Sequence, residues 1–349
     1  MTKSPVFAVT MGDPAGIGPE ITAKTLTEFA ASKDHHGIAV GDPVALRAAV
    51  EVLDLPVTVR VVDNWDTPAE EGVIDVYDTG SLGDEMVEWG VIDERAGRAA
   101  IAAIETATQA AMDGKVDAVV TGPINKEAIW AAGSKHLGHT EMLGELTGVT
   151  DQDTMFVTRI DETGHHLRIF FATRHQSLRD ALDSINIENQ MASIERAHRA
   201  LQVFGVKNPR LATAAINPHG GEGGAFGTEE IDVLIPAVEG VKEKGLDVAG
   251  PIPADSVFHH GIIGRYDGIL SQYHDQGHIA AKTFDFDKTI SVTVGLPILR
   301  TSVDHGTAFD IAGKGIADHD TMRSAYLAAV DYAPFVEDIR EEYTPKTDA

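Results

Sequence analysis

Cysteine is absent from the 349-residue chain, and its absence excludes several kinds of chemistry at once. Without thiols there are no disulfides, no thiolate metal ligands and no cysteine nucleophile, so any metal site has to use histidine, carboxylate or water. Basic residues are also scarce, because 28 lysines and arginines stand against 54 aspartates and glutamates, for a net charge of −26. Since binding a polyanion depends on lysine and arginine, nucleic acid is not expected as a partner.

Long apolar runs are lacking too, and no stretch approaches the length needed to cross a bilayer. The first residues lead into a strand-like run without the features of a secretory signal, so we expect a cytoplasmic protein with no membrane partner. The acidic residues are scattered rather than gathered in a tail, which suggests adaptation to high salt. Hydrophobic residues make up 43% of the chain, and its length favours two domains over one.

Short runs rich in Val, Ile and Phe alternate with longer segments of helical period, which predicts an α/β fold with a largely parallel sheet. We expect a helix to open at Pro19 and Glu20, where proline is tolerated in the first turn. Strands are predicted at residues 6–11, 116–120, 167–172, 210–216, 268–273 and 289–294. Helices are predicted at residues 94–112, 187–203, 228–244 and 318–332.

Three histidines each follow a predicted strand. His175, His219 and His274 come just past runs that end in ATR, INP and SQY. Ligands of open α/β sheets bind beyond the carboxyl ends of the strands, so imidazoles far apart in sequence can converge there. Such convergence would suit a divalent metal and leave coordination positions for substrate oxygens. Spacing alone also allows ordinary surface or core histidines.

Glycine clusters occupy residues 12–18, 220–227 and 305–315. Such loops let backbone amides approach a phosphate or a dinucleotide, although tight turns would explain them equally well. The first two clusters fail the Rossmann pattern, because Ile21 and Phe226 stand where the third glycine would be. A P-loop also fails, since Lys314 precedes glycine rather than Ser or Thr. A dinucleotide would therefore bind by another scheme.

The basic residues of the C-terminal half lie near these loops, namely Lys282, Arg300 and Lys314. We place Arg300 just beyond a predicted strand, where a guanidinium suits a phosphate or carboxylate. An ion pair with an acidic neighbour is the alternative. Earlier in the chain, Thr140 could serve only as the N-cap of a helix, and Lys126 could be a proton-transfer group or a solvated lysine.

Seven motifs in order resemble the 4-hydroxythreonine-4-phosphate dehydrogenase family across roughly residues 5–330: MGDPAGIGPE, TGPINK, GHTE, INPHGGEGGAFGTEE, PADSVF, YHDQGH and LPILRTSVDHGTAFDIAGKG. The segment HGTAFDIAGKGIAD is also similar to the cofactor loop of isocitrate and isopropylmalate dehydrogenases, which bind NAD(P) without the Rossmann glycines. The resemblance implies their fold, two α/β domains with an active-site cleft between them. We set the first domain at residues 1–133 plus 296–349 and the second, with metal site and dimer interface, at 134–295.

The resemblance also implies roles for individual residues. His175, His219 and His274 match the family's metal ligands for a cation such as zinc, magnesium or cobalt, with one ligand contributed across a homodimer interface. Substrate-binding positions match at His139, Thr140, Lys282, Ser291 and Arg300. The NAD or NADP loop matches at His305, Gly306, Asp310 and Gly313. Lys126 and Asp255 are the candidates for proton transfer.

The activity implied is NAD(P)-dependent oxidation and decarboxylation of a 4-phosphorylated 3-hydroxy acid, with 4-hydroxy-L-threonine 4-phosphate of pyridoxine biosynthesis as the reference substrate. Ser291 stands where the biosynthetic enzymes carry asparagine, so D-threonate or D-erythronate 4-phosphate is an alternative substrate. An aromatic cis-dihydrodiol dehydrogenase would not need Lys282 and Arg300 for a phosphate. The alternative hypothesis that involves no enzyme activity is a non-catalytic protein that binds a metal or a nucleotide.

Overall fold

Two compact units make up the computed structural model, which describes residues 4–345. Unit 1 takes the chain up to Asp153 and again from Ile290, and unit 2 is Thr154–Thr289. The boundaries predicted from the sequence are 133/134 and 295/296. The difference centres on helix α5 (His139–Thr147), which packs Met142 and Leu143 into the hydrophobic core of unit 1.

The sheet of unit 1 has the strand order β3-β4-β2-β1-β5-β12-β11. Its strands are parallel except β11, which runs antiparallel to β12. Their bounds are β1 (Val6–Thr10), β2 (His36–Gly41), β3 (Thr58–Val62), β4 (Val73–Asp78), β5 (Ala118–Thr121), β11 (Thr289–Val294) and β12 (Leu299–Ser302). The chain leaves β1 toward β2 on one side and returns from β4 to β5 on the other, so the order reverses between β1 and β5.

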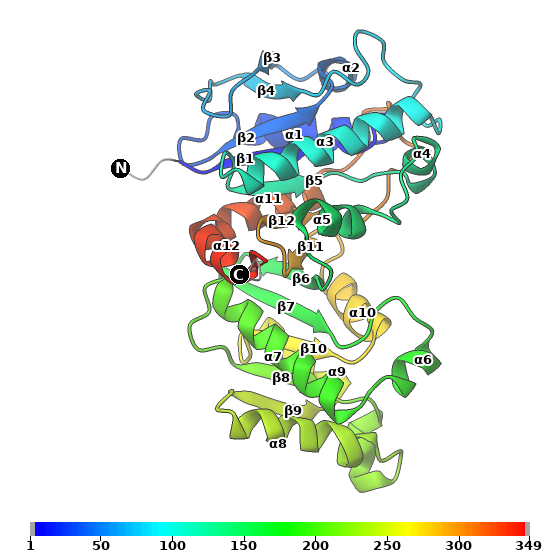
Figure 1. Ribbon diagram of the computed structural model, residues 1–349, viewed down its shortest axis with the longest axis vertical. Helices are drawn as coiled ribbons and strands as arrows, with labels where there is room; N and C mark the ends of the chain where they lie inside the picture. Colours follow the sequence, from blue (N-terminus) through cyan, green and yellow to red (C-terminus); the bar gives the residue numbers. More distant parts are fainter. Residues whose placement is uncertain (1–3, 346–349) are drawn as a thin grey trace. The chain divides into compact units, whose positions relative to one another are not determined.

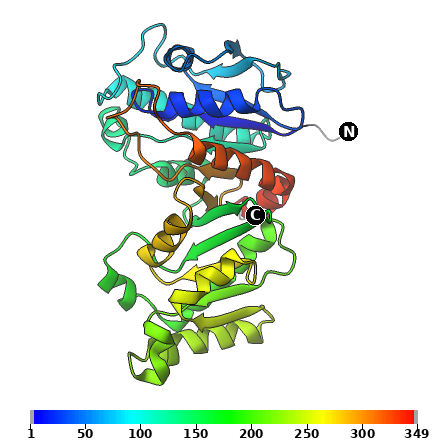
Figure 2. The same cartoon turned by 180° about the vertical axis from the view of Figure 1, so that it is seen from behind.

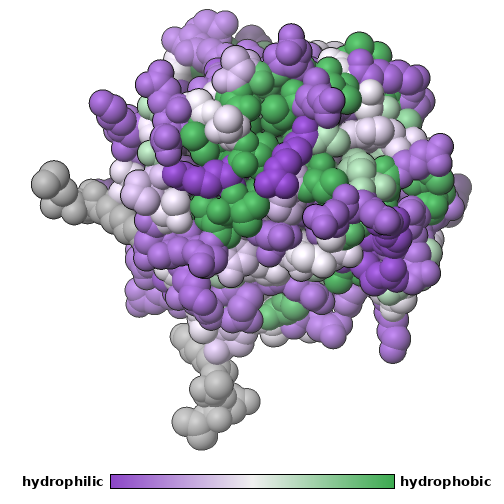
Figure 3. All heavy atoms as spheres, turned by 90° about the horizontal axis from the view of Figure 1, so that it is seen from above, coloured by the Kyte–Doolittle hydropathy of each residue, from purple (hydrophilic) through white to green (hydrophobic). Residues whose placement is uncertain are grey.

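Helices cover both faces of this sheet. α3 (Glu94–Met112) lies across one face, and α1 (Gly18–Phe29) and α11 (Asp320–Tyr332) lie side by side on the other (Figures 1 and 2). The remaining helices of unit 1 are α2 (Pro43–Val52), α4 (Lys126–Ala131), α5, the 3-10 turn η3 (Ala333–Phe335) and α12 (Val336–Tyr343). Figure 3 shows the molecule from above the view of Figure 1, with hydrophilic side chains surrounding smaller hydrophobic patches.

The sheet of unit 2 has the order β6-β7-β10-β8-β9. β7, β10, β8 and β9 are parallel, and β6 is antiparallel to β7. Their bounds are β6 (Asp153–Ile160), β7 (His165–Phe171), β8 (Leu211–Ala214), β9 (Val248–Ile252) and β10 (Gly268–Ser271). The helical segments are α6 (Leu178–Asp183), α7 (Ile187–Val203), η1 (Pro218–Gly224), η2 (Glu230–Leu234), α8 (Ile235–Glu243), α9 (Ala254–Ile262) and α10 (His274–Phe284).

Local sequence explains the elements that were predicted. α3 begins after Asp93, whose carboxylate accepts a hydrogen bond from the Arg95 amide at 2.7 Å, and its alanines form the buried face. The predicted helix at 228–244 is divided into the π-helical η2 and α8, because Pro236 in the first turn of α8 cannot donate the next backbone hydrogen bond. Among the described residues, no helix is long and apolar enough to span a membrane.

Candidate active site

The three histidines leave neighbouring parallel strands of unit 2. His175 follows β7, His274 begins α10 directly after β10, and His219 lies in η1 after β8. Because these strands are adjacent in the order β7-β10-β8, their carboxyl ends meet at the same edge of the sheet. The prediction that the three histidines follow strand ends is therefore confirmed for this sheet.

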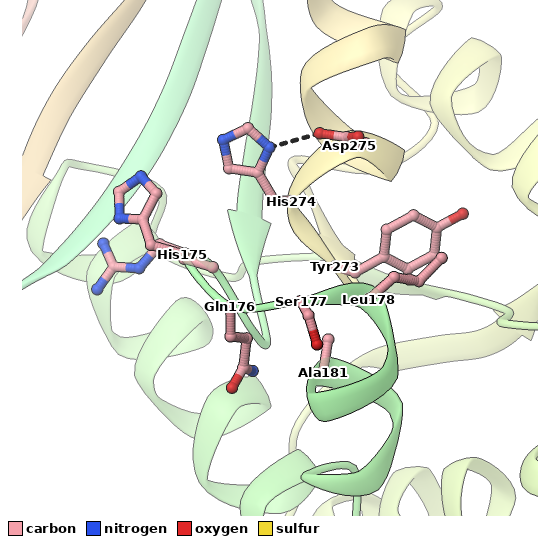
Figure 4. A pocket seen from close by; sticks show the side chains of 9 residues that line it. His175, Gln176, Ser177, Leu178, Ala181, Tyr273, His274 and Asp275 are labelled. Atoms are coloured by element: carbon pink, nitrogen blue, oxygen red, sulfur yellow. Dashed lines mark hydrogen bonds and ion pairs between the residues drawn. The ribbon is translucent and has the colours of Figure 1, made fainter.

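His175 and His274 lie together at a pocket of about 520 Å³ in unit 2 (Figure 4). Their ring centroids are 5.6 Å apart, with the planes at 46°. Nδ1 of His274 is 2.7 Å from a carboxylate oxygen of Asp275, which leaves its Nε2 on the side of His175. His278 stacks on His274 with 3.6 Å between ring centroids, so the His274 ring is supported on one face as well.

This pair has the geometry that one cation requires of two imidazoles. An imidazole nitrogen binds Zn²⁺ at about 2.0–2.1 Å, so two rings on one ion have centroids roughly 5–6 Å apart. A carboxylate on the second ring nitrogen, as Asp275 provides for His274, commonly fixes the orientation of a metal-binding histidine. The donor set therefore fits a divalent metal held by His175 and His274.

His219 does not complete a three-histidine group within the single chain. In residues 4–345, the group of three or more acidic and histidine side chains whose ligand atoms all lie within 4.8 Å of one another is Asp318, His319 and Asp320. That exposed group is used by the fold, since Asp318 accepts the Asp320 amide and His319 lies 3.6 Å from Glu28. His219 itself is exposed, with a left-handed backbone at φ 53°.

Residues that the sequence analysis did not single out hold the histidine loops in place. Gln272 donates from Nε2 to the Ala214 carbonyl at 2.8 Å, and Gln276 donates from Nε2 to Ala215 at 2.7 Å. The side-chain Oε1 of Gln276 in turn accepts a hydrogen bond from the backbone amide of Gln272 at 2.7 Å. Buried Glu230 accepts the amides of residues 216 and 217, each at 2.8 Å. The turn before His274 is thus bonded to the end of β8, from which the loop to His219 departs.

Arg300 is a buried cation of unit 1. The prediction that it lies beyond a strand is wrong, because it lies within one. It lies within β12, between β5 and β11, and only 6% of it is exposed. Its guanidinium donates to Thr121 Oγ1 from Nε at 3.1 Å and from Nη2 at 2.8 Å, and to Thr293 Oγ1 from Nη1 at 3.0 Å. Burial lowers the pKa of Arg300 to about 10, against a smaller opposing effect of Asp304. These hydrogen bonds go to threonine hydroxyls, so they do not form the ion pair with a carboxylate that was the alternative prediction.

His139 and Ser291 belong to the same region of unit 1. Nε2 of His139 is buried without a hydrogen-bond partner among the described residues, and burial together with nearby Arg300 holds its pKa well below the ordinary value. Ser291 is paired with Ser302 across β11 and β12, two residues from the pair of Thr293 with Arg300, so all four side chains share one sheet face. A buried guanidinium, a neutral imidazole and hydroxyls therefore gather here.

The other predicted site residues are dispersed. Gly138 occupies the N-cap position of α5, so the alternative role of Thr140 as the N-cap is wrong. Lys126 and Asp255 are both exposed in the first turns of α4 and α9, one in each unit. Lys282 is half-buried on α10 with its Nζ 5.4 Å from the centre of the Phe286 ring.

The loops at the carboxyl edge of unit 1 converge where the strand order reverses. Asp13, directly after β1, donates its amide to the Pro123 carbonyl after β5 at 2.9 Å. A Cβ on Gly12, at φ +72°, would come within 2.1 Å of that carbonyl, so only glycine fits this approach. Ligands of open α/β sheets bind at such reversals. The loop after β12 joins them, because Ile17 donates its amide to the Thr307 carbonyl at 3.0 Å.

Asp13 is a further candidate site residue that was not predicted from the sequence. The residue is fully buried, and its Oδ1 accepts the Ala15 amide at 2.8 Å, whereas Oδ2 has no partner among the described residues. Burial raises the pKa of Asp13 to about 6, with Asp93 adding to the rise. The predicted cofactor residues lie in the adjoining loop, where His305 Nδ1 is 2.9 Å from the Gly306 carbonyl and Lys314 donates to the Asp310 carbonyl at 2.6 Å.

Known proteins are similar to this chain over almost its whole length. The model of the family described as pyridoxal phosphate biosynthetic protein PdxA matches residues 33–329. A protein of Cutibacterium acnes, provisionally named D-threonate 4-phosphate dehydrogenase, is 58% identical and covers 99% of each chain. One of Halalkalibacterium halodurans, with the same provisional name, is 48% identical and covers 96% of this chain and 98% of its own.

The fold is shared with a solved structure as well. The crystal structure of a 4-hydroxythreonine-4-phosphate dehydrogenase from Klebsiella pneumoniae matches with a TM-score of 0.83 at 40% identity, covering 94% of this chain and 98% of the other. The predicted α/β fold class is confirmed by this match and by the parallel sheets described above.

Proposed function

This chain belongs to the family of the pyridoxal phosphate biosynthetic protein PdxA, as its seven motifs predicted, and we propose that it is an NAD(P)-dependent dehydrogenase of a 4-phosphorylated 3-hydroxy acid. The reference substrate is 4-hydroxy-L-threonine 4-phosphate, the substrate in the name of the Klebsiella relative. We also propose that the protein is located in the cytoplasm, as predicted from its sequence.

The observation that supports the proposal most strongly is that the Arg300 guanidinium is buried and hydrogen-bonded to hydroxyl groups. A buried cation is costly unless it is both paired with an opposite charge and hydrogen-bonded. Here the hydrogen bonds of the guanidinium go to the neutral hydroxyls of Thr121 and Thr293. An incoming phosphate or carboxylate would place a negative charge directly on the guanidinium through forked hydrogen bonds. His139 and Ser291 would add polar contacts to the same anion or to the neighbouring hydroxyl, and Thr140 and Lys282 are the further predicted contacts.

Removal of hydride from an alcohol also requires the hydroxyl proton to leave. A divalent cation at His175 and His274, with His219 as a third ligand, would supply Lewis acidity toward the hydroxyl and toward the charge that develops when carbon dioxide departs. In this proposal one of the three ligands comes from the partner subunit of a homodimer, since a single chain brings His175 and His274 together without His219. Lys126 and Asp255 are the proposed proton-transfer groups.

The coenzyme is proposed to bind along the edge of unit 1, at the loop with His305, Gly306, Asp310 and Gly313. This loop follows β12 and touches the 12–18 loop after β1, next to the reversal of strand order. That position is where dinucleotides bind in open parallel sheets. We propose NAD as the coenzyme, with NADP as the alternative.

D-Threonate 4-phosphate is the second candidate substrate. It is favoured by the provisional names of the relatives at 58% and 48% identity, and D-erythronate 4-phosphate belongs to the same class. Ser291 supports the same candidate, because a serine reaches less far than the asparagine of the biosynthetic enzymes. A substrate without an anionic group, such as an uncharged aromatic cis-dihydrodiol, would leave Arg300 uncompensated.

The test is to measure NADH or NADPH formation at 340 nm over a panel of 4-hydroxythreonine 4-phosphate, threonate 4-phosphate and erythronate 4-phosphate isomers, together with an aromatic cis-dihydrodiol. Each substrate would be assayed with NAD and NADP, with added Zn²⁺, Mg²⁺ or Co²⁺, and beside its unphosphorylated counterpart. We expect turnover with one phosphorylated acid and a much lower kcat/KM without the phosphate. Equal rates with an aromatic dihydrodiol, or no turnover of any member, would reject the proposal.

A further inference from the structure

Helix α1 carries three charged residues on one face, at intervals of four, and each contacts the chain that follows β12. Residues spaced i, i+4 and i+8 lie one above another on a helix. The three are Glu20, Lys24 and Glu28. Their partners come in the same order along the chain, and Glu20 contacts the end of the predicted cofactor loop, whereas Lys24 and Glu28 contact the chain beyond it, up to α11.

Glu20 makes the contacts that shape the loop. Its side chain is fully buried, and each carboxyl oxygen accepts one loop amide: Oε2 that of Gly313 at 2.9 Å and Oε1 that of Gly315 at 2.8 Å. Both glycines have a left-handed backbone, at φ +73° and +72°. A carboxyl group that binds two amides two residues apart fixes the turn between them.

The same loop is held at its other end by the start of α1. The Ile17 amide binds the Thr307 carbonyl at 3.0 Å, and a Cβ on Gly16 would come within 2.8 Å of Thr307. Between these anchors Ala308 has a left-handed backbone at φ 42°, a conformation that a residue with a Cβ adopts only when its surroundings impose it. Contacts with α1 and the residues just before it therefore hold the loop at both ends.

We propose that Glu20 is a positioning residue for the nicotinamide coenzyme, acting through the backbone of Gly313 and Gly315 without touching the coenzyme itself. This inference rests on the proposed function. Its physical reason is preorganisation: a loop already in its binding conformation loses less conformational entropy when the ligand binds. Lys24 and Glu28 contact the chain beyond the loop, since Lys24 donates to the Ala317 carbonyl at 2.5 Å and Glu28 accepts from Arg323 at 2.7 Å.

The experiment compares Glu20→Gln with Glu28→Gln in the full-length protein. Both variants replace a carboxylate on the same helix face, but Glu28 does not bond the 305–315 loop. NADH and NADPH binding are measured by fluorescence titration, KM for coenzyme and for acid substrate by steady-state kinetics, and Tm by calorimetry. Since hydrogen bonds to charged groups are the stronger ones, we expect Glu20→Gln to raise the coenzyme Kd and KM roughly tenfold. The KM for the acid substrate and kcat at saturating coenzyme should stay within about threefold, by the same reasoning.

The outcomes separate this inference from the function on which it rests. If the unaltered protein binds neither NADH nor NADPH, the proposed function itself fails. If the unaltered protein binds coenzyme and Glu20→Gln binds it equally well, the positioning role is rejected and the function stands. An equal loss of affinity in Glu20→Gln and Glu28→Gln would also reject it, because both carboxylates would then act only through the stability of the fold. Tm values identify a variant that has lost its fold, and in that case Glu20→Asp, which keeps the carboxyl group, is compared in its place.

Discussion

Arg300 and Thr121 lie on the adjacent parallel strands β12 and β5, and one threonine hydroxyl accepts two hydrogen bonds from the guanidinium, at 3.1 and 2.8 Å. The arrangement fixes the plane of the guanidinium, and among residues 4–345 the side-chain hydrogen bonds of Arg300 go to hydroxyls, with Asp304 acting on it only through its charge. A guanidinium held in one plane by hydroxyl groups can still form charge-assisted hydrogen bonds to an anionic substrate group.

Replacing Arg300 by methionine should impair recognition of the phosphorylated acid. Loss of a charge-assisted contact corresponds to about 1.5–3 kcal/mol, or roughly 10- to 100-fold in kcat/KM. Arg300→Lys should recover only part of it, because an ammonium group cannot form the fork. Steady-state kinetics on both variants, with half-exposed Arg323→Met as the control, would check this. An Arg300→Met enzyme with unchanged kcat/KM would contradict the anion-binding role.

Removal of the metal should abolish turnover, and a divalent cation should restore it. After its metal has been removed with a chelator, the protein is expected to bind Co²⁺ with visible absorption bands typical of imidazole ligands. His274→Ala or His175→Ala should weaken those bands. The measurement is a Co²⁺ titration followed by absorbance, together with activity before and after dialysis. Full activity in protein shown by elemental analysis to contain no metal would reject the metal site.

Asp275 should tune that site through His274. The carboxylate at 2.7 Å from Nδ1 orients the imidazole, and loss of such a partner typically costs 10- to 100-fold in metal affinity. We therefore expect Asp275→Asn to weaken Zn²⁺ binding by roughly this factor in competition with a chromophoric chelator. Asp318→Asn, in the exposed group at the start of α11, is the matched control and should leave the affinity as it is. If Asp318→Asn were the variant that lost metal, the assignment would be reversed.

Asp13 should make the stability of the protein depend on pH in a defined direction. Burial raises its pKa from 3.8 to about 6 in the folded state, so the folded protein holds this proton more tightly than the unfolded chain. The contribution of Asp13 is therefore fully present below pH 3.8 and is lost as the pH rises toward 6. Two pKa units correspond to about 3 kcal/mol.

Asp13→Asn tests that direction, because the amide does not titrate and still accepts the Ala15 amide through its oxygen. The variant should gain stability relative to the unaltered protein as the pH rises from 4 to 7, by up to about 3 kcal/mol. Denaturant unfolding at several pH values measures the difference. A difference that does not change with pH would show that Asp13 has an ordinary pKa in the folded state.

Ser291 should influence which acid is preferred. The residue is 8% exposed on β11, opposite Ser302 and on the same face as Arg300. We expect Ser291→Asn to shift the ratio of kcat/KM toward 4-hydroxythreonine 4-phosphate and away from threonate 4-phosphate, since the longer amide reaches further. A difference of one hydrogen bond corresponds to about 1 kcal/mol, or roughly fivefold. An unchanged ratio would mean that position 291 does not select the substrate.

Local sequence predicted much of the fold because local forces determine those elements. The helices at 94–112 and 187–203 agree with the structure at both ends, since capping residues and apolar periodicity mark them. The placement of three histidines after strands also agrees, because strand ends follow from short apolar runs. The strand containing Arg300 was missed, since it has only four residues and contains a charge that burial normally excludes.

What escaped prediction depends on contacts between distant segments. The burial of Asp13 depends on the approach of residues 12 and 122–125, and the bonds of Glu20 join positions nearly three hundred residues apart, as separations of 293 and 295 show. No periodicity or composition marks such a pair. The position of α5 in unit 1 likewise depends on which core accepts Met142 and Leu143, and a helix with one apolar face does not specify its partner.

The two glutamines beside His274 bear on how this protein can vary among its relatives. Gln272 and Gln276 bind successive carbonyls, those of Ala214 and Ala215, so the spacing of the two chains is matched residue by residue. Inserting or deleting one residue in either segment would misalign both amide–carbonyl pairs at once and leave buried polar groups unpaired. We therefore expect relatives to differ in this part of the chain by substitution and not by length, with insertions confined to loops away from it.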